Sequence, residues 1–337
     1  MIIDPKIAVV IPSYKVTAHI IGVLANFGPE VKRIYVIDDC CPDNSGDYVE
    51  ARCHDPRIRV IRHAQNAGVG GAVLTGYQAA IEEGMDIVVK VDGDGQMDPK
   101  LLPRFVMPIV EGWSDYTKGN RFYDLAEINQ MPKIRLFGNA GLSFMTKISS
   151  GYWGIFDPTN GYTAIDTRVA AKLPFEKISS RYFFETDMLF RLNTLRAVVT
   201  DVPMHAHYGD EESNLKIKKI FLEFLGKHTR NAFKRIFYSY FLRDMNAASL
   251  ELIFGVIFFL FGAIFGTAHW INSSTHDIST PIGTVMLAAL PMIAGIQLLL
   301  AFVNYDVANA PSRAISKLLP RKNSPESAPE SPVRPSS

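Results

Sequence analysis

Two long apolar runs near the carboxyl terminus constrain this 337-residue chain more than any other feature. Residues 252–268, extended by His269, Trp270 and Ile271, contain no charged side chain, and neither do residues 282–303. A helix of roughly 20 apolar residues is long enough to cross the hydrocarbon core of a bilayer. We therefore expect a membrane segment at 249–304, with transmembrane helices at about 251–271 and 282–303.

The distribution of basic residues around these runs predicts their orientation. The connecting residues 272–281 contain no Lys or Arg. The tail after the second run contains four close together: Arg313, Lys317, Arg321 and Lys322. By the positive-inside rule, the amino-terminal domain and the tail, residues 305–337, should both be cytoplasmic, in a multi-pass protein of the inner or plasma membrane. The tail is rich in Pro and Ser from about residue 320, which predicts disorder there.

Cysteine usage agrees with a reducing compartment. The chain has three cysteines, an odd number, and Cys40 and Cys41 are adjacent, so a disulfide framework is not expected. The formal net charge is only +1, which gives no global attraction to polyanions. We therefore expect no nucleic-acid partner.

A basic amphipathic segment precedes the membrane runs. Residues 216–243 contain eight Lys or Arg and one acidic residue, Glu223, interleaved with apolar residues at helical spacing. This pattern is typical of a helix lying on an anionic membrane surface, although a solvated helix packed on the domain has a similar pattern. We assign 216–248 to juxtamembrane helices and expect anionic lipids as partners.

The amino-terminal residues 1–215 have the alternating pattern of an α/β domain. Apolar strands are expected at 7–11, 31–37, 58–61 and 86–91, with helical patterns between them. This alternation predicts a mostly parallel, Rossmann-like sheet, in which ligands bind at the carboxyl ends of the strands. Polar residues follow several of these strands: Tyr14, Asp38, Asp39 and Asp92.

The last of these strands ends in two carboxylates, Asp92 and Asp94, each followed by glycine. Carboxylates this close repel one another unless they share a cation, and Mg²⁺ or Mn²⁺ prefers oxygen ligands. A solvated Asp-Gly turn would have the same sequence. We expect Asp92 and Asp94, with Gln96, to bind a divalent cation that neutralises a diphosphate.

Other residues complete a nucleotide-diphosphate site. Asp38 or Asp39 can accept hydrogen bonds from a nucleobase or ribose, and residues 68–71 offer amide donors at a helix start. Arg121 and Arg135 have the guanidinium geometry that suits phosphate. A dinucleotide-binding site is excluded because no Gly-x-Gly-x-x-Gly turn follows the first strand, and a P-loop because no Gly-Lys-Ser/Thr occurs.

The set of motifs resembles family 2 glycosyltransferases of the GT-A fold, in the polyprenyl-phosphate branch that includes dolichyl-phosphate mannosyltransferases and bactoprenol glucosyltransferases. The resemblance covers about residues 7–215. It lies in residues 10–14, 37–39, 66–72, 92–96, 119–121 and 184–187. It implies metal binding by Asp92, Asp94 and Gln96, and catalytic roles for Arg121, Arg135 and Asp187. The donor-binding residues would be Pro12, Tyr14, Asp38, Asp39, Asn66, Gly68, Gly71 and Asp92.

The resemblance further implies transfer of a sugar from a nucleotide-diphosphate sugar to undecaprenyl or dolichyl phosphate, by a single inverting displacement. A hydroxyl acceptor would need Asp187 as a general base, whereas an ionised phosphate acceptor would need Asp187 only to position groups. Mannosyltransferase relatives often have an arginine and a Ser-Lys pair where this chain has residues 208–215. That difference slightly favours a UDP-sugar over GDP-mannose as the donor.

Two alternatives remain at this stage. The same donor site would serve a transferase acting on a hydroxyl of a lipid-linked glycan or lipid, and a catalytically silent membrane scaffold would keep the fold alone. Further partners to expect are a downstream flippase or glycosyltransferase. The sequence leaves the oligomeric state open, although Gly255, Gly262 and Gly266 would let transmembrane helices of two copies pack closely.

Overall fold

The computed structural model describes residues 4–123, 133–204 and 217–320, except for the side chains of 133–135 and 217–221. The chain divides into two compact units. One, called the catalytic unit after the active site expected there from the sequence, runs to Asn231 and resumes at Pro311. The other, called the membrane unit after the membrane-crossing helices expected there, covers Ala232–Ala310.

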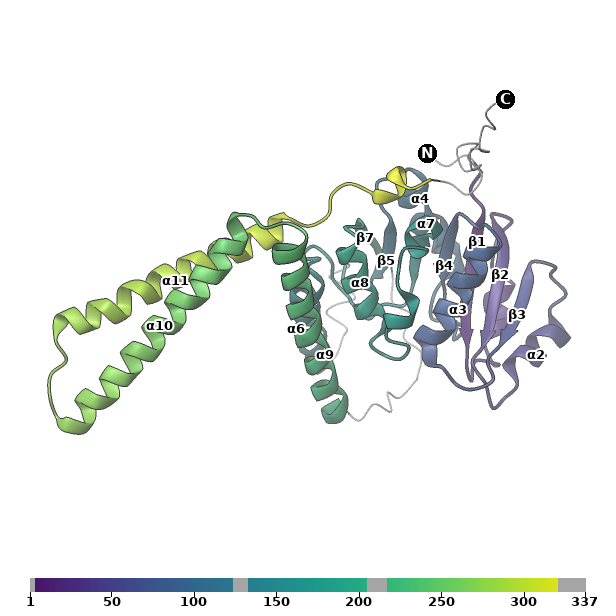
Figure 1. Ribbon diagram of the computed structural model, residues 1–337. Helices are drawn as coiled ribbons and strands as arrows, with labels where there is room; N and C mark the ends of the chain where they lie inside the picture. Colours follow the sequence, from purple (N-terminus) through teal and green to yellow (C-terminus); the bar gives the residue numbers. More distant parts are fainter. Residues whose placement is uncertain (1–3, 124–132, 205–216, 321–337) are drawn as a thin grey trace, which may run out of the picture. The chain divides into compact units, whose positions relative to one another are not determined.

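A seven-stranded sheet in the order β3-β2-β1-β4-β6-β5-β7 forms the centre of the catalytic unit (Figure 1). Four of its six strand pairings are parallel, and β6 is antiparallel to both its neighbours. The prediction of a mostly parallel sheet is therefore confirmed. The strands are β1 Ile7–Ser13, β2 Val31–Asp38, β3 Ile58–Arg62, β4 Ile87–Lys90, β5 Tyr116–Asn120, β6 Thr163–Asp166 and β7 Val199–Pro203.

Helices cover both faces of this sheet because its central strands are apolar on both sides. In β1, Val9 packs into one core with Phe105 of α4, and Val10 packs into a second core with Tyr77 of α3 and Met188 of α8. The helices of the catalytic unit are α1 Ile20–Leu24, α2 Ser45–Arg52, α3 Gly68–Glu82, α4 Leu102–Val110, α6 Lys133–Ser150, α7 Thr167–Ala170 and α8 Phe184–Thr194, followed by α9 Ile217–Phe237, which continues into the membrane unit.

The membrane unit contains two helices, α10 Ala247–His276 and α11 Ile282–Ala308, that are long and apolar enough to cross a membrane. Both are longer than the apolar runs alone indicate. The helix α10 begins earlier because the Asn246 side chain caps its first turn, with Ser249 completing a capping box. It ends at Asp277, a residue in the left-handed conformation that commonly terminates helices.

Glycines bring α10 and α11 close together within the chain. A Cβ at Gly262 would lie 2.6 Å from the carbonyl oxygen of Ala288, and one at Gly295 would lie 2.5 Å from the amide nitrogen of Phe259. Gly255 likewise faces Leu299 of α11. These glycines therefore serve contacts inside the hairpin, and association between copies stays a prediction.

A buried ion pair joins the end of α9 to the end of α11 inside the membrane unit. Arg235 donates to both carboxylate oxygens of Asp306, at 2.6 and 3.0 Å, and the Tyr240 hydroxyl donates to the same carboxylate at 2.6 Å. All three side chains are buried. Because both fork donors of the guanidinium meet the carboxylate, the pair fixes the direction in which α9 meets α11.

After α11 the chain returns to the catalytic unit. Both oxygens of Asp115, just before β5, accept backbone amides of the tail, from Ile315 at 2.9 Å and Ser316 at 2.8 Å. Arg168 donates to the carbonyl oxygen of Leu319 at 3.3 Å. The tail is thus docked as far as Leu319. The disorder predicted from about residue 320 falls almost wholly outside the described residues.

Candidate functional site

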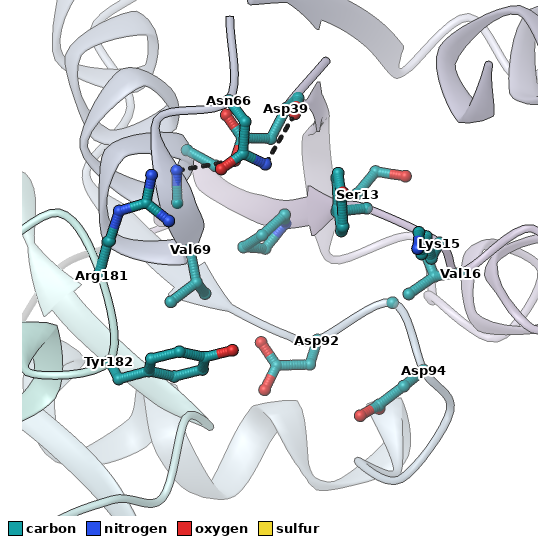
Figure 2. Close-up of a pocket in the computed structure, with 15 residues that line it drawn as sticks. Ser13, Lys15, Val16, Asp39, Asn66, Val69, Asp92, Asp94, Arg181 and Tyr182 are labelled. Carbon is teal, nitrogen blue, oxygen red and sulfur yellow. Dashed lines mark hydrogen bonds between the residues drawn. The ribbon is translucent and has the colours of Figure 1, made fainter. Parts of the chain in front are cut away.

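A cavity of about 600 Å³ opens at the carboxyl ends of β1 and β4, beside the start of α3 (Figure 2). This is the edge of the sheet where the sequence places its polar residues. The cavity also has a wall from the segment just before α8. Its lining residues are Pro12, Ser13, Tyr14, Lys15, Val16, Asp39, Asn66, Gly68, Val69, Ala72, Asp92, Gly93, Asp94, Arg181 and Tyr182.

The adjacent aspartates after β2 have different positions. Asp38 lies outside the cavity lining, and its two oxygens accept the backbone amides of Cys41 and Gly46 at 2.8 and 2.7 Å. Asp39 lines the cavity and accepts the amides of Ala67 and Gly68 at 2.7 and 2.8 Å. The carboxylate of Asp39 therefore holds the start of α3 against the end of β2.

The glycines at the start of α3 make room for the segment that precedes α8. Gly68 has φ +84°, and a Cβ there would lie 2.6 Å from the carbonyl oxygen of Ser180. A Cβ at Gly70 would lie 2.7 Å from the carbonyl oxygen of Ser179. The amide of Gly71, which is outside the cavity lining, donates to Ser180 at 3.1 Å. The amides of Gly68 and Gly71, expected to meet a ligand, thus have acceptors within the chain.

Asp92 is held by a buried lysine. The Lys90 ammonium lies 3.0 Å from Oδ1 of Asp92 and 3.2 Å from Oε1 of Glu185 (these three residues form the β4 cluster). Burial alone would lower the pKa of Lys90, but the two carboxylates raise that pKa above its ordinary value. The lysine stays charged and fixes one oxygen of Asp92. The Asp92 side chain nevertheless remains 29% exposed.

The carboxylates of Asp92 and Asp94 both line the cavity, whereas the half-buried Gln96 does not. The backbone amide of Gln96 donates to Oδ1 of Asp94 at 3.0 Å. Within residues 4–123, 133–204 and 217–320, there is no group of three or more His, Cys, Asp or Glu side chains that could hold a metal ion. Two carboxylates nevertheless fit Mg²⁺, which takes most of its remaining ligands from substrate phosphates and water in nucleotide sites.

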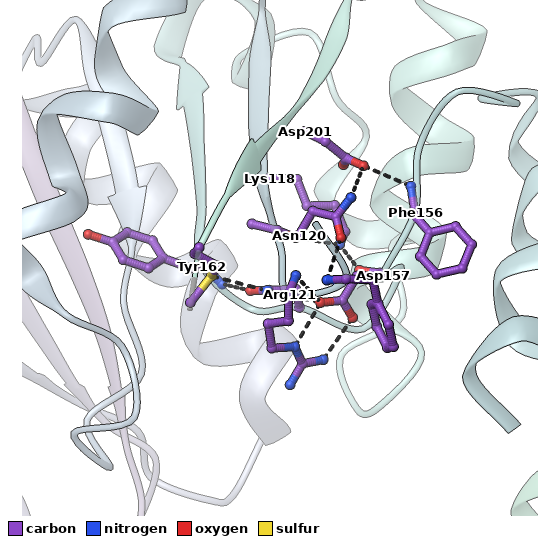
Figure 3. Close-up of polar contacts among 11 residues, drawn as sticks. Lys118, Asn120, Arg121, Phe156, Asp157, Tyr162 and Asp201 are labelled. Carbon is purple, nitrogen blue, oxygen red and sulfur yellow. Dashed lines mark hydrogen bonds and ion pairs between the residues drawn. The ribbon is translucent and has the colours of Figure 1, made fainter. Parts of the chain in front are cut away.

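Of the two arginines expected to bind phosphate, Arg121 lies outside the cavity lining. Arg121, just after β5, forms a two-point ion pair with Asp157, with both N–O distances 2.7 Å (Figure 3). Arg135 belongs to α6, and its side chain is outside the described residues. The phosphate roles of Arg121 and Arg135 therefore stay predictions.

Arg121 belongs to a second polar cluster, here the β5 cluster, made of Lys118, Arg121, Asp157 and Asp201 (Figure 3). Lys118 donates to the carbonyl oxygen of Asp157, and burial lowers the pKa of Lys118. Burial would raise the pKa of Asp157, but Arg121 and Lys118 hold that pKa below its ordinary value. Asp201 accepts the Phe156 amide at 2.8 Å, and burial raises its pKa to about 6.

The two clusters meet at Gly161, in the loop that Asp157 begins. A Cβ on Gly161 would lie 2.7 Å from Oδ2 of Asp92 and would press against the Lys90 ammonium. The β5 cluster holds the start of this loop, because the guanidinium of Arg121 and the ammonium of Lys118 both bind Asp157. The loop thereby forms the surface behind the Asp92 carboxylate.

Asp187, the candidate general base, is fully buried in α8 and lies outside the cavity lining. Its Oδ2 accepts the amide of Ser179 at 2.9 Å, and its Oδ1 accepts the Asn231 side chain, also at 2.9 Å. Asn231 lies in α9, where the nearby His228 is bonded to Ser149 at 2.8 Å and has a pKa lowered to about 4 by burial. In this arrangement Asp187 connects the segment before α8 to α9.

Sequence reasoning missed Lys15, Arg181 and Tyr182 in the cavity lining. Arg181 and Tyr182 come from far along the chain and directly precede the Phe-Glu-Thr-Asp motif. The glycines at 68–71 were the available signal, because they show that another segment approaches the start of α3. They do not identify which segment approaches.

The comparisons with known proteins agree with this geometry. Residues 8–173 match the model of "Glycosyl transferase family 2". A dolichyl-phosphate N-acetylglucosaminyltransferase of Methanococcus voltae, which uses UDP-N-acetylglucosamine, is 28% identical over 223 residues, covering 61% of this chain and 88% of that protein. An undecaprenyl-phosphate mannosyltransferase of Micrococcus luteus is 28% identical over 204 residues, covering 59% and 82%.

Solved structures are similar in fold at low sequence identity. Mannosyl-3-phosphoglycerate synthase of Rubrobacter xylanophilus superimposes with a TM-score of 0.51 and 16% identity, covering 72% of this chain and 77% of that chain. At this identity the likeness concerns the fold alone. It agrees with the α/β architecture expected from the order of strands and helices.

Proposed function

The chain is a glycosyltransferase with a family 2 domain, and we propose that it transfers a sugar from a nucleotide-diphosphate sugar to a polyprenyl phosphate. The observation that carries this proposal is the pair of cavity carboxylates, Asp92 and Asp94, at the end of β4. Relatives named for dolichyl-phosphate and undecaprenyl-phosphate transfer support the class of acceptor.

Asp92 and Asp94 would hold Mg²⁺ or Mn²⁺. When bound, such an ion neutralises charge on the diphosphate leaving group. Lys90 orients Asp92 for this role, because its ammonium lies 3.0 Å from Oδ1. The nucleoside would lie toward Pro12, Tyr14, Asp39 and Asn66, which also line the cavity.

The acceptor phosphate needs little help to react. A phosphate monoester is already ionised at neutral pH, so its oxygen can attack the anomeric carbon in line with the departing diphosphate and invert the configuration. Asp187 would then position groups without removing a proton. Its burial and its two amide donors support this role over that of a base.

The carboxyl-terminal part of the chain, from residue 216, would hold the enzyme at the membrane. We propose a glycosyltransferase domain at 1–215, juxtamembrane helices at 216–248, a hairpin at 249–304 and a tail at 305–337. The length and apolar surface of α10 and α11 support membrane crossing. The basic residues that flank the hairpin support a cytoplasmic location for the catalytic unit and the tail.

The donor nucleotide is proposed as UDP, with GDP as the alternative. The Methanococcus relative is named for a UDP-sugar, whereas the Micrococcus relative is named as a mannosyltransferase. Residues 208–215, which carry the sequence preference for UDP, lie outside the described residues. The donor is therefore the first variable of the experiment.

The test incubates membranes containing the full chain with radiolabelled UDP-glucose, UDP-N-acetylglucosamine or GDP-mannose, together with undecaprenyl phosphate and Mg²⁺. We expect label from one donor in a lipid product that mild acid hydrolyses, as a glycosyl phosphate should. Membranes containing Asp92→Asn protein are the control and should give no product. Label only in an acid-stable lipid or glycan would refute the phosphate acceptor and favour the alternative hydroxyl acceptor.

A further inference from the structure

A nucleotide diphosphate brings negative charge into a cavity that already contains Asp39, Asp92 and Asp94. Of the groups expected to bind phosphate, those that the structure describes already have partners within the chain. Arg121 is bound to Asp157, and the amides of Gly68 and Gly71 bind Asp39 and Ser180. Among the described residues, two cationic side chains line the cavity, Lys15 and Arg181.

We propose that Arg181 binds a phosphate oxygen of the nucleotide-sugar donor. This inference rests on the proposed function and deepens it, because it assigns a donor-binding residue outside the family motifs in this chain. A guanidinium presents two parallel N–H donors, which match the oxygens of a phosphate group.

Arg181 differs from three other arginines of the catalytic unit because its guanidinium has no carboxylate partner among the described residues. Arg57, Arg121 and Arg168 each donate to an aspartate at 2.7 Å or less. In the part of the chain that the structure describes, the Arg181 side chain makes no hydrogen bond or ion pair, and it is exposed at the cavity. An arginine fork without an acceptor is ready for an anionic ligand.

The backbone that carries Arg181 is fixed from two sides. Ser179 donates its amide to Asp187 at 2.9 Å, and Ser180 accepts the amide of Gly71 at 3.1 Å. The aliphatic part of Arg181 lies over Gly68, where a Cβ would be 2.9 Å from Cγ of the arginine. The charged group is thereby held beside the start of α3, on the opposite side of the cavity from Lys15 (Figure 2).

The position of Arg181 also complements that of the carboxylates. In Figure 2, Arg181 lies toward Val69 and Asn66, whereas Asp94 lies at the far end of the cavity beyond Asp92. A diphosphate between them would meet a guanidinium at one side and a carboxylate-bound cation at the other. Tyr182, next to Arg181, directs its hydroxyl toward Asp92 in the same view.

The experiment measures calorimetric binding of UDP and GDP to the purified full chain in detergent with Mg²⁺, and of the corresponding nucleosides. In the Arg181→Gln variant, affinity for the preferred diphosphate should fall about 10- to 100-fold, as expected for loss of a charge-assisted pair, while nucleoside binding is unchanged. Arg181→Lys should give an intermediate loss, because it keeps the charge without the fork.

A matched control removes a nearby charge outside the cavity. Lys177 is exposed and lies 4.0 Å from Glu176, so Lys177→Gln should bind both nucleotides as the unmodified chain does. Equal diphosphate affinity in Arg181→Gln and the unmodified chain would overturn the proposal. Binding of neither diphosphate by the unmodified chain would overturn the proposed function as well, which separates the two failures.

A kinetic measurement distinguishes the two sources of phosphate. If Arg181 binds the donor, the KM for the nucleotide sugar should rise in Arg181→Gln while the KM for undecaprenyl phosphate stays within about twofold. A raised KM for undecaprenyl phosphate with unchanged diphosphate affinity would assign Arg181 to the acceptor and refute the proposal. A melting temperature equal to that of the unmodified chain would exclude unfolding as the cause.

Discussion

Lys90 and Lys118 are both buried in the same sheet, on strands separated only by β6, yet their surroundings shift their pKa values in opposite directions. In the β4 cluster, Lys90 meets two carboxylates, and its pKa is raised. In the β5 cluster, Lys118 donates to backbone carbonyls, and burial lowers its pKa.

The carboxylates of the two clusters also differ in exposure, and this difference indicates different roles. Asp92 in the β4 cluster keeps 29% of its side chain exposed, whereas Asp157 in the β5 cluster keeps 1%. A carboxylate held by a buried lysine and open on its other side can bind a ligand. A carboxylate that is buried and paired with a guanidinium stabilises the fold instead, so we expect changes to Asp92 to affect activity and changes to Asp157 to affect stability.

The largest expected effect is that of Asp92→Asn in the β4 cluster. Turnover with saturating donor and Mg²⁺ should fall at least about 1,000-fold, because the cation loses a charged ligand at the leaving group. Thermal stability should change little, since Lys90 keeps Glu185 as a partner. The exposed Asp98, which caps the next turn through the Lys100 amide, provides the control Asp98→Asn. Turnover of Asp92→Asn within tenfold of the unmodified chain would contradict a metal role.

The next largest effect is that of Asp157→Asn in the β5 cluster. Breaking this buried pair should lower the free energy of unfolding by about 3 kcal/mol, because Arg121 loses its carboxylate partner while Lys118 keeps only the backbone carbonyl of residue 157. Denaturant titration in detergent would measure this change. Asp47→Asn, which removes an exposed partner of Arg62, should cost less than about 1 kcal/mol. Equal losses in the two variants would show that the β5 cluster is not a structural anchor.

Gly161→Ala tests the point where the two clusters meet. The added methyl group would displace Lys90 or Asp92, so turnover should fall about 100-fold and the metal concentration for half-maximal rate should rise. Gly154→Ala is a suitable control because nothing lies within 4 Å of its added Cβ. Unchanged metal dependence in Gly161→Ala would mean that the loop does not support Asp92.

The smallest effect concerns pH and Asp201. Its pKa of about 6 in the fold exceeds the unfolded value of roughly 3.9, so this group favours the folded state at low pH and costs stability as pH rises from about 4 to 6. Asp201→Asn keeps an oxygen for the Asn120 and Phe156 donors. Its free energy of unfolding should exceed that of the unmodified chain by about 1 kcal/mol at pH 8, with the gain vanishing near pH 4. A gain independent of pH would assign the effect to another cause.

The sequence predicts the part of the cavity formed by strand ends and the start of α3. It does not predict the part formed by the segment before α8. Asp39, Asn66 and Asp92 follow strands or open a helix, and parallel strands bring such residues to one edge whatever the details of packing. Arg181 reaches the same cavity through the close approach of residues 179–184 to the glycines of α3. No periodic pattern encodes that tertiary contact.

Asp38 and Asp187 show a second limit of sequence reasoning. Both are carboxylates at motif positions, and both are buried with two hydrogen-bond donors each from their own chain. A motif gives the residue type at a position, whereas its role depends on which groups already occupy its oxygens.

Asp115 holds the returning tail, so both flanks of the hairpin are joined to the same catalytic unit: α10 through α9, and α11 through residues 311–319. A cut in the turn between His276 and Ile282 would therefore leave each helix covalently attached to that unit. The turn is the place to insert a protease site or a fluorescent label without releasing either helix. Two flanks on one unit also require an even number of crossings, so a label in that turn would report from the opposite face of any bilayer the hairpin spans.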